Sequence, residues 1–192
     1  MITRKRALLL IFLAMLGVFI SYFITRRQLF DIKTAKIRLK HFRSLIEEIS
    51  ETIIPSTDSP GAKDAKVVDY IINVIDHCID EKNTSIILNG LDDLQRYSIK
   101  NYAKRFEECS SDARTAILKH FNTKGRFSNY YLNKIRQKLL GETFFEQIKW
   151  LTVSGYCLSR EGASHGLVYD HIPIDYIACT PYLKQQKAWA TH

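Results

Sequence analysis

The chain has 192 residues, of which 46% are hydrophobic and 25% charged, a composition typical of globular proteins that argues against a disordered or fibrous chain. Its net charge is +8, and the stretch from Arg4 to Arg43 contains ten basic residues and one acidic residue. These basic residues lie on both sides of an apolar stretch. They therefore indicate contact with anionic lipid headgroups and argue against nucleic acid as the partner.

The apolar stretch runs from Ala7 to Ile24 and contains 18 residues without a charge. As a helix it would be about 27 Å long, close to the thickness of a hydrocarbon core. The alternative is a cleaved signal peptide, whose apolar region is usually about 7 to 15 residues and is followed by a site with small residues. Ser21-Tyr22-Phe23 is not such a site. We therefore predict a transmembrane anchor within residues 1–28 that is not cleaved.

The orientation of this anchor has two interpretations. Seven basic residues follow the apolar stretch and three precede it, so the positive-inside rule favours a cytoplasmic domain. The segment from Thr3 to Leu9, in contrast, resembles a degenerate twin-arginine export signal in which Arg4-Lys5 replaces the arginine pair. Charge alone thus favours a cytoplasmic domain, whereas the likeness to an export signal favours the opposite orientation.

The first helices of the remaining chain follow from the spacing of apolar residues. Residues 29–46 are expected to form a basic amphipathic linker helix, and the apolar pattern continues from Ile37 to Ile54. Pro55 ends it, and the run from Pro55 to Gly61 predicts a turn in which Asp58 and the serines bond to backbone amides. Further helices are expected over 67–79 and 83–106, the second weakened or broken at Gly90.

The last helices are predicted mainly by their caps. Ser110 is a suitable N-cap for a helix that reaches Phe121, and another helix is expected over 128–140. Thr143 begins a possible capping box with Glu146, which predicts a helix towards Tyr156. Beyond it the glycines, prolines and tyrosines predict an irregular tail. The fold class is thus all-α, with residues 47–192 as one helical domain behind the membrane helix.

No residue pattern in the chain predicts catalysis. Glycine-rich phosphate loops and the nucleophile elbow are absent from the sequence, and adjacent carboxylates such as Asp92-Asp93 point away from each other on a helix. The pair His77-Cys78 has no partner pair at metal-ligand spacing. We therefore predict no catalytic, cofactor-binding or metal-binding residue. The alternative is a metal-dependent enzyme that uses the cluster of His165, Asp170 and His171, near Asp175 and Cys179.

Two stretches carry a resemblance to a known family. The first runs from Thr52 to Ala62, with the sequence TIIPSTDSPGA, and is followed by Val67, Tyr70 and Ile71. The second comprises Gly155-Tyr156, Ser159, Gly162-Ala163, Leu167, Tyr169-Asp170, Pro173, Tyr176, Cys179, Pro181-Tyr182 and Ala188-Trp189. Together they resemble subunit 3 of membrane-bound gluconate 2-dehydrogenase over Glu47 to Ala190. The departures are Ser159-Arg160-Glu161, Ile174 and Ala178, which alter local turns.

The resemblance implies a small subunit without chemistry of its own, held at the inner membrane by a single span with its domain in the periplasm. Its partner would be a flavoprotein of the glucose-methanol-choline type that carries FAD and oxidises a sugar or gluconate, in some complexes together with a cytochrome c subunit. The alternative function, which the basic residues after the apolar stretch favour, is a membrane scaffold that faces the cytoplasm.

The resemblance also implies which residues matter for the partner. Those expected at the partner interface are Gly155, Tyr156, Ser159, Gly162, Tyr169, Pro173, Tyr176, Cys179, Pro181, Tyr182 and Trp189. Those expected to form the motif turn are Pro55, Thr57, Asp58, Pro60 and Gly61. Cys179 is further expected to form a disulfide, either with Cys157 or with the partner chain.

Overall fold

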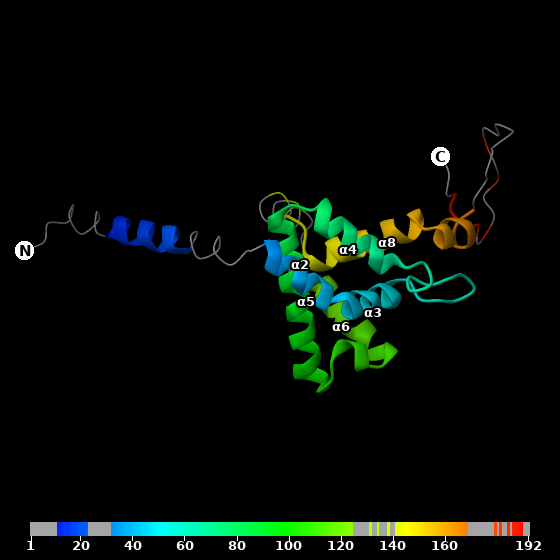
Figure 1. The fold of residues 1–192 in the computed structure, drawn as a ribbon, viewed down its shortest axis with the longest axis horizontal. Helices are drawn as coiled ribbons and strands as arrows, with labels where there is room; N and C mark the ends of the chain where they lie inside the picture. The colour runs from blue at the N-terminus through cyan, green and yellow to red at the C-terminus, as the bar shows by residue number, and fades with distance from the viewer. Residues whose placement is uncertain are drawn as a thin grey trace, which may run out of the picture.

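The structure is a computed structural model (Figure 1) that describes residues 11–22, 32–124, 131, 134, 138, 141–168, 179, 181, 184 and 186–189. The regular elements in these ranges are helices, and an isolated β-bridge joins Val168 to Trp189. The prediction of an all-α fold is thus confirmed. The helix expected over 128–140 lies almost wholly outside the described residues.

Two helices, α2 (Ile32–His41) and α3 (Arg43–Ile53), occupy the region where one continuous helix was expected. They are separated at Phe42, whose side chain is buried together with Leu39, Leu45 and Ile46. The apolar positions repeat every three or four residues, so they lie on one face of α3 and pack inward. The core therefore begins before residue 47, where the domain was expected to start.

The next two helices are α4 (Val67–His77) and α5 (Glu81–Tyr102). Of the two expectations for Gly90, a break in α5 is wrong, because the helix continues through it without interruption. A Cβ atom at Gly90 would lie 2.1 Å from Cγ of Phe144. The glycine thus allows the ring of Phe144 to pack directly on the backbone of α5, and this packing compensates for its low helix propensity.

The predicted caps are confirmed at the remaining helices, which are α6 (Ser111–Thr123) and α8 (Phe144–Leu158). Ser110 Oγ accepts a hydrogen bond from the amide of Ala113 at 3.4 Å. At α8 the reciprocal capping box is complete, because the Thr143 amide donates to Glu146 at 2.9 Å and the Glu146 amide donates to Thr143 Oγ1 at 3.3 Å. A short 3-10 turn, η1 (Phe106–Glu108), and a π turn, η2 (Gly162–Gly166), complete the described elements.

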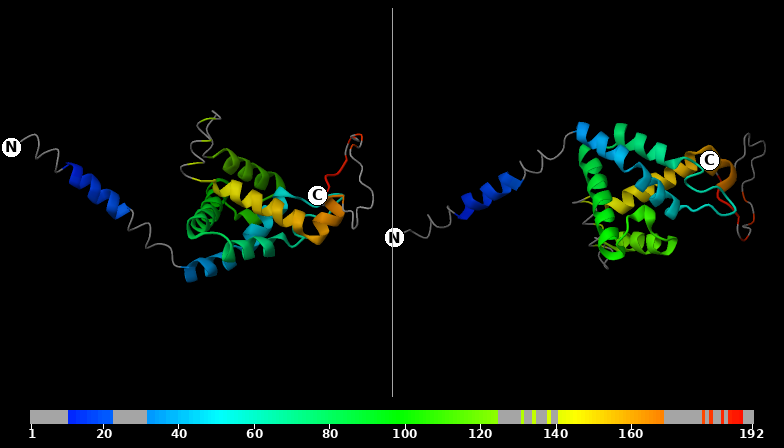
Figure 2. Two further views of the ribbon diagram at one scale, coloured as in Figure 1. Left: turned by 90° about the horizontal axis from the view of Figure 1, so that it is seen from above. Right: turned by 60° about the horizontal axis from the view of Figure 1, so that its bottom comes forward.

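Helix α8 is the centre of the bundle and contacts α3, α4, α5 and α6 (Figure 2). The core between these helices consists of large apolar side chains. The largest of its fully buried side chains are Phe106, Leu45, Ile46, Ile49, Ile71, Ile75, Ile87, Leu88, Leu91, Leu94, Ile117 and Ile148. The C-terminal end of α8 reaches the turn between α3 and α4, so this end of the bundle contains the first stretch of the family resemblance and the residues Gly155 to Gly162 of the second.

The N-terminal apolar stretch is described over residues 11–22, which are helical and drawn in blue in Figure 1. Among the described residues, no helix has both the length and the apolar character required to cross a membrane. The remainder of the predicted span from Ala7 to Ile24 lies outside the described residues.

Candidate partner interface

The motif turn between α3 and α4 is held in place by a carboxylate from the helix that precedes it. Glu51 accepts hydrogen bonds from two backbone amides, those of Ser56 at 3.0 Å and Lys63 at 2.9 Å. A Cβ atom at Gly61 would lie 2.6 Å from the Ser56 nitrogen and 2.7 Å from Glu51 Oε1. Position 61 therefore has to be glycine for Glu51 to reach both amides.

Hydrogen bonds within the turn complete its closure. The amide of Ala62 donates to the carbonyl of Ile54 at 3.0 Å, and that of Gly61 donates to Asp64 Oδ2 at 3.0 Å. The expectation that Asp58 and the serines would bond to the amides is wrong within the described residues, because Glu51 and Asp64 do so. Pro55, Thr57 and Asp58 are exposed instead, so the tip of the turn is open to a partner.

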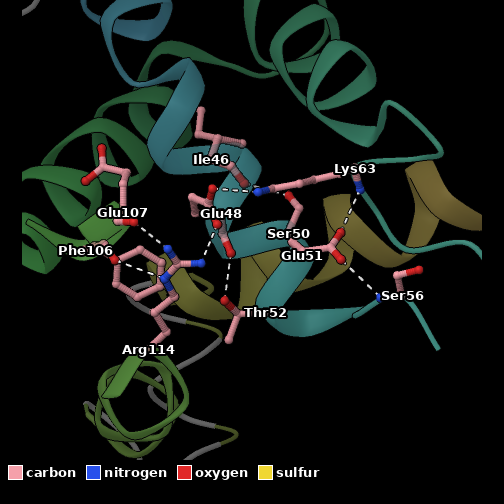
Figure 3. A network of polar contacts seen from close by, with 10 residues as sticks. All are labelled: Ile46, Glu48, Ser50, Glu51, Thr52, Ser56, Lys63, Phe106, Glu107 and Arg114. Carbon is pink, nitrogen blue, oxygen red and sulfur yellow. Dashed lines mark hydrogen bonds and ion pairs between the residues drawn. The ribbon is translucent and has the colours of Figure 1, made fainter. Parts of the chain in front are cut away.

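A second set of polar contacts connects the turn to the rest of the bundle (Figure 3). The carboxylate of Glu48 lies between two cations, Lys63 Nζ at 2.6 Å and the guanidinium of Arg114. Arg114 also donates to the backbone carbonyls of Glu107 and, at 3.2 Å, Phe106. Because Glu48 and Arg114 are about four-fifths buried, their ion pair forms largely away from solvent, and together the contacts fix α3, the turn, η1 and α6 relative to one another.

Sequence reasoning did not identify Glu48, Glu51, Lys63 or Arg114 as important. One sequence signal could have found Glu51. It lies in the last turn of α3, where the partial negative charge of the helix end makes a carboxylate unfavourable. An acid at this place indicates that another group compensates it, and here two backbone amides do so.

Tyr156 joins the two stretches of the resemblance, which are about a hundred residues apart in the sequence. Its side chain is buried, and its hydroxyl donates to the carbonyl of Pro60 at 2.9 Å. The neighbouring Gly155 allows α8 to approach α4, because a Cβ atom there would lie 2.7 Å from Tyr70 Cδ1. The pair Gly155-Tyr156 thus fixes the end of α8 against α4 and against the motif turn.

The chain beyond α8 turns back on Tyr156. Ser159 Oγ donates to the Tyr156 carbonyl at 2.7 Å and accepts from the Gly162 amide at 2.9 Å. A Cβ atom at Gly162 would lie 2.0 Å from the same carbonyl oxygen, so only glycine permits this tight reversal. The π turn η2 follows, and the amide of Val168 donates to the carbonyl of Ala188 at 2.8 Å.

The family follows from a match over most of the chain. Residues 40–174 match the model of the family described as gluconate 2-dehydrogenase subunit 3. The chain belongs to the gluconate 2-dehydrogenase subunit 3 family. No curated protein and no solved structure gives a significant match. Membership places this chain among the small subunits of gluconate dehydrogenase complexes.

In this subunit 3 chain, the residues expected at the partner interface fall into three groups. Gly155, Tyr156 and Gly162 are buried and Ser159 is half-buried, so they determine the shape of the surface. Cys179, Pro181 and Trp189 are exposed, with Trp189 51% accessible. Tyr169, Pro173, Tyr176 and Tyr182 lie outside the described residues. The role of all these residues at an interface stays a prediction.

The cysteines of this subunit 3 chain are free thiols. Cys78, Cys157 and Cys179 are exposed, and Cys109 is buried. The disulfide expected between Cys179 and Cys157 is therefore not formed in the structure. A disulfide between Cys179 and a partner chain stays a prediction.

The alternative metal site is only partly described. His165 is exposed, and its Nδ1 atom lies 2.9 Å from Ser164 Oγ, whereas Asp170, His171 and Asp175 lie outside the described residues. Where the structure describes the chain, no three His, Cys, Asp or Glu side chains are grouped for a metal ion. His77 lies next to exposed Cys78, and its Nδ1 atom is 3.0 Å from the carbonyl of Asn73.

The hydrogen bond between the two stretches gives a simple prediction. Tyr156→Phe removes only the hydroxyl that reaches Pro60, leaves that carbonyl without this donor, and is expected to cost about 1 kcal/mol of unfolding free energy. Tyr102→Phe is the matched control, because Tyr102 is exposed at the end of α5 and no change is expected there. Urea unfolding followed by circular dichroism measures both. Equal stability of the two variants would contradict the role assigned to Tyr156.

Proposed function

We propose that this chain is the non-catalytic small subunit of a periplasmic, membrane-bound dehydrogenase complex that oxidises a sugar or gluconate with FAD. In this proposal the catalytic subunit is a flavoprotein of the glucose-methanol-choline type, in some complexes accompanied by a cytochrome c subunit. The small subunit assists export of the flavoprotein, stabilises it and holds it at the membrane. FAD belongs to the partner, and this chain carries no cofactor.

The observation that supports the proposal is that the motif turn of the first stretch and Tyr156 of the second meet at one end of the bundle. Glu51 and Tyr156 keep the motif turn in a fixed shape, and the exposed tip from Pro55 to Asp58 lies at its surface. A preformed surface lowers the conformational entropy lost on association. The arrangement therefore suits a permanent subunit contact.

Attachment to the membrane is proposed from the N-terminal helix. Over residues 11–22 its side chains are exposed, among them Phe12 at 62%, Val18 at 72% and Phe19 at 62%. An exposed apolar surface of this kind is costly in water and is typical of contact with lipid or protein. Tyr22 near the end of the apolar stretch and the arginine pair after it, Arg26-Arg27, are residues that favour the interface of a bilayer.

The decisive measurement is recovery of the partner. The full chain with a C-terminal affinity tag, purified from its native membrane in mild detergent, is expected to bring down a flavoprotein with close to one FAD per chain. Flavin absorbance after denaturation of the sample gives the ratio. A preparation without flavin would contradict the proposal.

A second candidate, a scaffold that faces the cytoplasm, is favoured by the seven basic residues that follow the apolar stretch. The two candidates differ in the location of the C-terminus. Alkaline phosphatase, which folds only where disulfides form, is expected to be active when fused after His192. An inactive fusion together with an active cytoplasmic reporter would support the scaffold.

A further inference from the structure

The outer side of α8 has the character of an interface rather than of a free surface. The helix is apolar around most of its circumference, although it buries only one side in the core. On the other side Trp150 is 61% exposed, Val153 is 42% exposed, and Cys157 is also accessible. These three residues are spaced by three and four positions, so they form one stripe along the helix. A surface helix normally carries polar residues at such positions.

A cavity of about 180 Å³ opens beside this stripe, between α3, α6 and α8. Its base is apolar and consists of Ile53, Leu118 and Phe145, the last two buried. Asn122 and the lysines Lys119 and Lys149 also line it, and both lysines are exposed. The cavity thus combines an apolar base with a rim of positive charge on two different helices.

The two lysines of the rim have no salt-bridge partner in the described part of the chain. Within the described residues, neither Lys119 nor Lys149 forms a salt bridge, whereas Lys63 and Arg114 each pair with Glu48. Covering two lysines with an uncharged surface would be unfavourable, because each would lose water without gaining a counter-charge. A group that covers this cavity therefore has to bring carboxylates.

Lys149 also connects the cavity to the exposed stripe. It lines the cavity, directly precedes Trp150, and lies one helical turn from Val153. Residues four positions apart occupy the same side of a helix. The cavity and the stripe therefore form one continuous surface, which we call the α8 docking surface: Ile53, Leu118, Lys119, Lys149, Trp150 and Val153.

We propose that the α8 docking surface binds the flavoprotein subunit, which inserts an apolar side chain into the cavity and places carboxylates against Lys119 and Lys149. This inference rests on the proposed function and adds a second contact to it. Phe145 and Tyr156 are 11 positions apart, so the cavity lies about 16 Å along α8 from the motif turn. An exposed tryptophan next to a pocket is typical of residues that dominate binding energy.

A lipid surface is the other class of partner that an exposed tryptophan and lysines could indicate. The shape of the surface favours protein. A bilayer is flat on this scale and leaves a concave pocket uncovered, whereas a protruding side chain of a protein fills it. Asn122 at the cavity adds an amide that can form directed hydrogen bonds, which is typical of protein interfaces.

The test uses the full chain in mild detergent and the flavoprotein subunit separated from the same complex. Trp150→Ala is expected to weaken their association about 30-fold, as for a central interface residue. The double variant Lys119→Glu/Lys149→Glu is expected to weaken it at least about 10-fold, with the largest effect at low salt. Matched controls on α5 are Tyr102→Ala and Lys100→Glu, both at exposed positions, and neither is expected to change the affinity by more than about twofold.

Each outcome has a defined meaning. A wild-type chain that does not bind the flavoprotein contradicts the proposed function itself. If the wild type binds and the α8 variants bind equally well, the inference is wrong while the proposed function stands. Binding to vesicles of phosphatidylethanolamine and phosphatidylglycerol tests the lipid alternative. If the variants lose binding to vesicles but still bind the flavoprotein, the surface contacts the membrane and the inference is wrong. Unchanged circular dichroism spectra ensure that the variants are folded.

Discussion

Replacing Arg114 with methionine is expected to lower the unfolding free energy by about 3 kcal/mol and the melting temperature by roughly 6 to 12 °C. The guanidinium pairs with Glu48 and donates to the carbonyls of Phe106 and Glu107. Methionine keeps much of the aliphatic volume but cannot donate a hydrogen bond. It leaves a mostly buried carboxylate with only Lys63 as its cation, and two carbonyls lose their donor.

The control for this prediction is the same change at an exposed ion pair. Arg96 binds Asp93 on the surface of α5, with side chains 75% and 47% accessible. Pairs of this kind contribute little, so Arg96→Met is expected to change the stability by less than about 0.5 kcal/mol. Thermal unfolding of both variants in the same detergent gives the comparison. Equal melting temperatures would show that Arg114 is not what fixes α6 against α3 and η1.

Replacing Gly90 with valine is expected to destabilise the bundle by about 3 kcal/mol, although helix propensity alone predicts a small gain. A Cβ atom at this position would lie 2.1 Å from Cγ and 2.5 Å from Cβ of Phe144. Two further methyl groups increase this overlap. Phe144 is 8% exposed and packs edge-on against Phe121, so it has little room to move. Steric overlap therefore outweighs propensity.

The neighbouring residue provides the control for Gly90. Asn89→Val introduces the same side chain one position earlier on α5, at an exposed site, and is expected to be close to neutral because asparagine and valine have similar helix propensities. A second variant tests the cause. Gly90→Val combined with Phe144→Ala is expected to lose less stability than the sum of the single changes, since alanine removes the overlapping ring. Simple additivity in urea unfolding would contradict the steric explanation.

Much of the local structure could be predicted from the sequence, because it depends on neighbouring residues. Ser110 and Thr143 begin their helices as expected, since an N-cap bonds to amides two or three positions ahead. The apolar spacing likewise located α4, and Pro55 marks the end of α3. The family resemblance, which depends on motif residues alone, was confirmed by the match over residues 40–174.

The errors arose where a distant contact decided the outcome. Gly90 was expected to weaken or break its helix, but the helix is continuous, and Phe144, more than fifty positions away, packs on the glycine. Asp58 was expected to bond within its own turn, but Glu51 from the preceding helix reaches the amides instead. Several carboxylates in the sequence could bond to the amides of the turn. The packing of the helices determines which carboxylate is close enough.

The sequence by itself determined the all-α class, most helix ends and the family, because periodicity, caps and motifs depend on residues that are close in the chain. Tertiary structure alone decided that Tyr156 reaches Pro60, that Glu48 lies between Lys63 and Arg114, and that Lys119 and Lys149 line one pocket. The polar contacts join residues that are 15 to 96 positions apart in the sequence. The two lysines belong to different helices. No local pattern encodes them, because they depend on how α3, α6 and α8 pack around a shared core.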